Sequence, residues 1–155
     1  MLRIIGRTCG AAVMALGLAG GAFAHHGVTG QYDAATPIVI SGTVTAATFA
    51  PPHPVISVRV DADTVPDFTV GRPAEYFGAA VVRPEDVGEV REIELSPVRM
   101  FYDLADRLAV GDQVVIVVLR NCLPPHQLRS TWVRLSDGTV ISYTGDWAPG
   151  VDGCS

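Results

Sequence analysis

Apolar and polar residues alternate in several short segments of the chain. Within residues 37–48, Ile38, Ile40 and Val44 fall on one face of an extended backbone, which predicts a strand with one buried side. The same alternation recurs in two further segments, residues 55–60 and 90–95. The first part of the chain therefore predicts three strands.

A short helix is predicted after the third strand. Ser96 is a residue type that caps helix starts, and Pro97 suits the first helical position. Four apolar residues then recur at helical spacing, namely Val98, Phe101, Ala105 and Leu108. We expect one short amphipathic helix whose apolar side packs against the strands.

The remaining strands follow this helix. Residues 114–119 form a continuous apolar run, which is typical of a strand that is buried on both faces. Residues 131–135 alternate again, and Asp137-Gly138 predicts a hairpin into a last strand at 140–143. Three strands, a helix and then two strands is the element order of an OB-fold. We therefore expect an all-β protein with one short helix, in a small OB-fold-like antiparallel barrel of five to six strands; a generic antiparallel sandwich is the alternative.

The first 24 residues predict a cleavable signal peptide. Arg3 and Arg7 precede an uncharged stretch at 10–20, and Ala22-Phe23-Ala24 is typical of a signal-peptidase site. The uncharged stretch is too short to span a bilayer. We expect cleavage after Ala24 and export to the periplasm, with no transmembrane anchor left in the mature chain.

The mature chain, residues 25–155, has the length of a single domain. Its apolar pattern weakens at 61–89, where glycine and proline interrupt it, so this segment is expected to be a surface excursion containing a possible helix at 74–81. Glu85 and Asp86 within it are expected to face solvent. Residues 145–155 read as a C-terminal tail.

Charge narrows the range of partners. The chain carries a net charge of -5 and all its basic residues are arginine. Nucleic-acid binding relies on clustered basic side chains, so nucleic acid is not an expected partner. The chain also has no nucleophile elbow, zinc-protease helix or phosphate-binding loop, so enzymatic activity is less expected than ligand binding.

Two cysteines remain after the predicted cleavage, Cys122 and Cys154. In an oxidising compartment an even pair is most simply a disulfide, which here would close a loop of about thirty residues and attach the tail to the barrel. The alternative is a free Cys122 thiolate that serves as a soft metal ligand.

The mature chain resembles an uncharacterised family of small exported bacterial proteins that begin His-His-Ser-Phe and carry Glu-Tyr-Asp and then Asn-Pro-His. It departs from that pattern where Gly27 and Val28 replace Ser and Phe, where Gln31 replaces Glu, where Pro51 replaces Asn, and at residues 61–89, which look like an insertion. The resemblance implies export and a fold but no activity. The matching residues are His25-His26, Tyr32-Asp33, Pro52-His53, Ser96-Pro97, Gly111-Asp112, Leu135 and Asp137-Gly138.

All four histidines belong to the mature chain. Cleavage after Ala24 would leave His25 at the N-terminus followed by His26, while His53 and His126 each follow a Pro-Pro pair in an interstrand loop. OB-folds bind ligands with these two loops. A terminal histidine can chelate a metal through its amine and ring together, and nitrogen-rich tetragonal sites favour Cu(II).

Three interpretations of the histidines remain. The first is an exported, non-enzymatic module that binds copper or another transition metal through His25, His26, His53 and His126. The second is a copper-dependent oxidoreductase with a histidine-brace site. The third is a metal-free domain that binds a small molecule or an envelope protein. Against all three stands the plain alternative that His25 and His26 are a frayed chain end and that His53 and His126 are ordinary polar loop residues.

Overall fold

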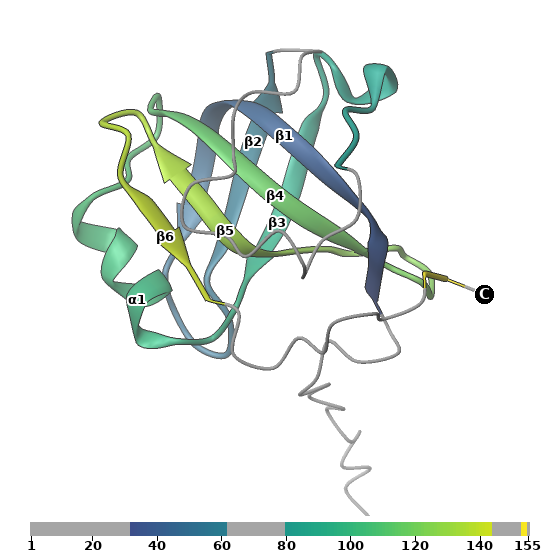
Figure 1. Cartoon of the computed structure of the whole chain (residues 1–155). Coiled ribbons are helices and arrows are strands. Elements are labelled where there is room, and N and C mark those ends of the chain that lie inside the picture. The colour runs from purple at the N-terminus through teal and green to yellow at the C-terminus, as the bar shows by residue number, and fades with distance from the viewer. Residues whose placement is uncertain (1–31, 62–79, 144–152, 155) are drawn as a thin grey trace, which may run out of the picture.

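The computed structural model describes residues 32–61, 80–143 and 153–154, and six strands in these ranges form one sheet (Figure 1). Most of their length matches the alternating segments of the sequence. Their bounds are β1 (Tyr32–Thr48), β2 (Val55–Val60), β3 (Val90–Leu95), β4 (Gln113–Asn121), β5 (Leu128–Leu135) and β6 (Val140–Ser142).

The sheet closes into a five-stranded barrel. Its strand order is β3-β2-β1-β4-β5-β6, and a parallel pairing between β3 and β5 joins the ends of the first five strands. All other strand pairs are antiparallel. β6 lies outside the ring, on the edge of β5. The closure confirms the OB-like barrel and rules out the open sandwich.

The interior of the barrel is filled by alternate residues from all five of its strands. Ile40, Val58, Ile93, Ile116 and Val133 are fully buried in this core. On the opposite face of the sheet a second apolar group is also buried, comprising Tyr32, Val39, Val117, Leu119 and Trp132. β4 is therefore buried on both faces, as its continuous apolar run predicts.

The helix is shorter than predicted and starts later. α1 (Arg99–Tyr102) follows Val98, and a 3₁₀ turn, η3 (Asp103–Asp106), continues it. Ser96 does not cap it, because its hydroxyl is buried and donates a hydrogen bond to the Ser130 carbonyl oxygen at 3.3 Å. The predictions of a Ser96 cap and a Pro97 start are wrong.

The apolar side of this helix also differs at one position. The 3₁₀ turn spaces side chains three residues apart, so Leu104 follows Phe101 into the core and Ala105 is exposed. Leu108 is buried as predicted. A change of helix type after Tyr102 thus moves one position of the predicted stripe.

The described part of the excursion is more closely attached to the barrel than expected. Val81 forms an isolated parallel bridge with Ile38, and η2 (Pro84–Asp86) precedes β3. Asp86 is only 2% exposed, because Arg83 and Arg91 both bind its carboxylate. The prediction that Asp86 faces solvent is wrong, whereas Glu85 is exposed. The possible helix at 74–81 lies largely outside the described residues.

Candidate ligand-binding rim

The two Pro-Pro-His loops meet at one end of the barrel. The loop at 49–54 leads into β2, where Val55 is the register partner of Glu94 on β3. The loop at 122–127 leads into β5, where Leu128 is the register partner of Ile93. We call these two loops, together with Tyr32, Glu94 and Arg129, the rim.

In the first loop, His53 is the candidate ligand-binding side chain. Its side chain is 17% exposed, and Nδ1 lies 3.1 Å from Oε1 of Glu94. The two groups are near enough to attract when the ring is charged, but Nδ1 is not aligned for a hydrogen bond and has no hydrogen-bond partner among the described residues. The Tyr102 hydroxyl donates to the Pro52 carbonyl oxygen at 2.9 Å, so the helix segment holds this loop in place.

His126 is held in a different way at the tip of the second loop. It has a φ of 61°, a left-handed conformation that histidine adopts more readily than most residues. Its Nδ1 lies 3.0 Å from the Asn121 carbonyl oxygen. A carbonyl oxygen only accepts, so in this contact Nδ1 carries the hydrogen and Nε2 of the neutral ring keeps a free lone pair.

A chain of polar contacts connects the two loops. Glu94 lies near His53 through Oε1 and accepts a hydrogen bond from the Gln127 amide through Oε2. The side-chain oxygen Oε1 of Gln127 in turn accepts a hydrogen bond from the Tyr32 hydroxyl at 3.4 Å. Glu94 thus links the loop of His53 to the residue that follows His126.

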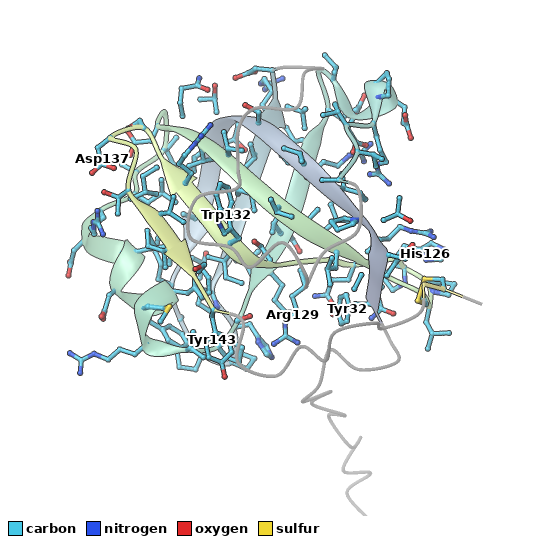
Figure 2. The ribbon with its side chains drawn as sticks, in the orientation of Figure 1. Tyr32, His126, Arg129, Trp132, Asp137 and Tyr143 are labelled. Carbon is cyan, nitrogen blue, oxygen red and sulfur yellow. A yellow bond between two sulfur atoms is a disulfide. The ribbon has the colours of Figure 1, made fainter. Side chains whose placement is uncertain are left out.

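Arg129 lies beside this chain and was not singled out by the sequence. It is 7% exposed, and its Cζ lies 5.9 Å from the centre of the Tyr32 ring (Figure 2). Its Nε is buried without a hydrogen-bond partner in the described part of the chain. It lies before the strand predicted at 131–135, so only the three-dimensional pairing of β3 with β5 identifies it.

The disulfide between Cys122 and Cys154 is present, as predicted. It attaches residue 154 to the start of the 122–127 loop, with the two Cα atoms 5.3 Å apart. A bridged Cys122 cannot act as a thiolate ligand, so this structure does not support the alternative of a metal-binding Cys122. The disulfide therefore joins the start of the 122–127 loop, which carries His126, to residue 154.

A groove of about 670 Å³ borders the second loop. It runs from η2 and the start of β3 to His126, and its lining mixes arginine and acidic side chains. The charged lining residues are Arg83, Glu85, Asp86, Arg91, Glu92 and Arg120.

The structure therefore locates two of the four candidate histidines. His53 lies beside Glu94 and His126 beside the Asn121 carbonyl, while His25 and His26 lie outside the described residues. Within the described ranges, no three or more His, Cys, Asp or Glu side chains are grouped closely enough to hold a metal ion. No helix of these ranges is long and apolar enough to cross a membrane.

Comparison with known proteins gives a partial match. No curated protein and no solved structure matches the chain. Residues 13–71 match the model of a family of unknown function (DUF6152). This region contains β1, the loop of His53 and β2. Over this part of its length, the chain is similar to an uncharacterised family.

Proposed function

We propose that this protein is an exported, non-enzymatic module that binds Cu(II) at the rim. The observation that carries the proposal is the way in which the two loop histidines are held. His126 Nδ1 contacts a backbone carbonyl and His53 Nδ1 faces a carboxylate, so the Nε2 atoms are the ones left for a ligand. Metal-binding histidines are commonly oriented by such contacts at the nitrogen that does not bind the metal.

The mature N-terminus supplies the remaining ligands in this proposal. After cleavage behind Ala24, His25 would offer its amine and ring nitrogen to one ion, and His26 would be an alternative ring ligand. Nitrogen ligands in a tetragonal arrangement favour Cu(II), which stands highest in the divalent affinity order. Since the metal must displace a proton from an amine that titrates at about 7.7 to 8, binding should weaken as pH falls.

A titration with Cu(II) tests the part played by the loops. We expect His53→Gln and His126→Gln each to weaken binding by about tenfold or more, because each removes one imidazole ligand. Glu94→Gln should weaken it less, because Glu94 only orients His53. Glu89→Gln is the matched control, since Glu89 is exposed, directly precedes the same strand and does not line the groove beside His126. Unchanged affinity in both histidine variants would exclude the loops from the site.

A further inference from the structure

Arg129 is a buried cation whose charge is not matched by any described carboxylate. The ion pairs in the described ranges involve Arg83, Arg91, Arg99, Arg107 and His53, and none involves Arg129. Burial alone does not explain why Arg129 lacks an ion-pair partner. Asp86, the other strongly buried charged residue, is bound by two guanidinium groups, whereas Arg129 Nε has no hydrogen-bond partner there.

Among the described neighbours of Arg129, none binds its Nε. Glu94 is its register partner across β3 and β5, but the Glu94 oxygens face His53 and Gln127. The Tyr32 ring packs near Cζ while its hydroxyl is directed to Gln127. Figure 2 shows Arg129 and Tyr32 next to each other at the end of the barrel where β1 and β5 begin.

A charge that is taken out of water without an opposite charge is unfavourable, and a protein tolerates it mainly where a partner supplies that charge. The planar guanidinium forms paired hydrogen bonds with carboxylate and phosphate oxygens. We propose that Arg129 is a binding site for an oxyanion, the carboxylate or phosphate group of a small ligand that enters the rim beside Tyr32. This proposal does not depend on copper.

The direct test uses the metal-free mature protein, treated with a chelator. Acetate and inorganic phosphate are titrated at constant ionic strength against chloride, while the Arg129 Nε–Hε signal is followed by NMR and assigned by its loss in Arg129→Met. We expect a saturable shift with acetate, phosphate or both, and the stronger of the two identifies the class of ligand. Arg129→Met, followed through the ring signals of the neighbouring Tyr32 because it lacks the Nε–Hε signal, should bind at least about tenfold more weakly, since it has lost a charged hydrogen-bond donor. Arg99→Met is the matched control, because Arg99 is 93% exposed and its loss removes the same charge.

Thermal unfolding separates a binding role from a purely structural one. If Arg129 is an anion-binding site, Arg129→Met should have a higher melting temperature in chloride than the unmodified protein. Acetate or phosphate should raise the melting temperature of the unmodified protein only. A lower melting temperature of the variant with an unchanged response to anions would overturn the proposal. So would a linear, unsaturable NMR shift equal to that in chloride. The anion titration is made on metal-free protein and the copper titration without added anion ligand, so failure of one proposal is distinguishable from failure of the other.

Discussion

Gly42 shows how closely neighbouring backbones approach in the barrel. It lies in the middle of β1, paired with Val60 on one side and Val114 on the other. A Cβ atom at this position would lie 1.9 Å from the Arg59 carbonyl oxygen. The obstacle is backbone, so no side chain can move aside to relieve it.

We expect Gly42→Ala to lower the free energy of unfolding by about 2 to 4 kcal/mol, because β1 and β2 must separate to admit the methyl group. Urea denaturation measures this, with Ser41→Ala as a control at the neighbouring, partly exposed position. Equal stability of the two variants would contradict the close approach.

Asp137 makes stability depend on pH at the β5–β6 turn. The Thr139 backbone amide donates a hydrogen bond to its carboxylate at 2.7 Å, and this lowers the pKa of Asp137, with a smaller contribution from Arg107. A carboxylate with a lowered pKa stabilises the fold above the unfolded value of about 3.9. That contribution is lost as pH falls through the folded pKa.

Asp137→Asn should therefore flatten the acid side of the stability profile. We expect the urea midpoint of the unmodified protein to fall more steeply below about pH 4 than that of the variant. Asp106→Asn, at an exposed position, serves as the control. Parallel profiles for Asp137→Asn and the unmodified protein would refute this role.

The sequence identifies some site residues and misses others for a clear reason. The repeated Pro-Pro-His triplets single out His53 and His126 because the residue types are unusual. Glu94 occupies an ordinary polar position of a predicted strand, and Arg129 precedes the strand predicted at 131–135. The two residues come together only where β3 pairs with β5. His25 and His26 remain predictions.

At the level of elements, strand positions follow from alternation more closely than helix ends do. β2 and β3 have the predicted bounds, because each alternates cleanly. β1 begins five residues earlier than predicted, since Tyr32 and Asp33 pair with β4 before an irregularity that the local pattern does not reveal. The helix start differs because Ser96 is bonded to β5 rather than to the helix, a tertiary contact that local residue types cannot show.

The attachment of η2 to β3 depends on Asp86. We expect Asp86→Asn to lower the free energy of unfolding by roughly 2 to 3 kcal/mol, because two arginines lose a charged partner; the partial exposure of both arginines keeps the loss below that of a fully buried pair. Chemical denaturation measures this change in the free energy of unfolding. Glu85→Gln, at an exposed carboxylate 4.0 Å from Arg83, should change it little. A similar loss in both variants would mean that burial of Asp86 is unimportant.

The disulfide constrains the loop of His126 and the end of the chain. It closes a sequence separation of 32 residues, which corresponds to about 3 to 4 kcal/mol in the chain-entropy account of crosslinks. We expect the double variant Cys122→Ser, Cys154→Ser to lose this amount in denaturant unfolding. A loss below about 1 kcal/mol would mean that the bridge mainly positions the loop rather than stabilising the fold.

At the scale of the whole molecule, the order of elements predicts the barrel because few topologies place one helix between the third and fourth strands of a small all-β domain. The parallel closure of β3 on β5 brings the two Pro-Pro-His loops together at Glu94. The barrel therefore places two histidines, from segments more than seventy residues apart, near the same series of polar contacts around Glu94. Within this arrangement, a mature N-terminal histidine would complete a nitrogen-rich site.

The most direct test of the copper proposal compares two forms of the protein, one that begins at His25 and one that carries an extra residue before it. Each is titrated with Cu(II) and examined by electron paramagnetic resonance. We predict tight one-to-one binding with nitrogen hyperfine structure in the first form and its loss in the second, because the extra residue removes the terminal amine of His25. Weak and equal binding in both forms would contradict the proposal.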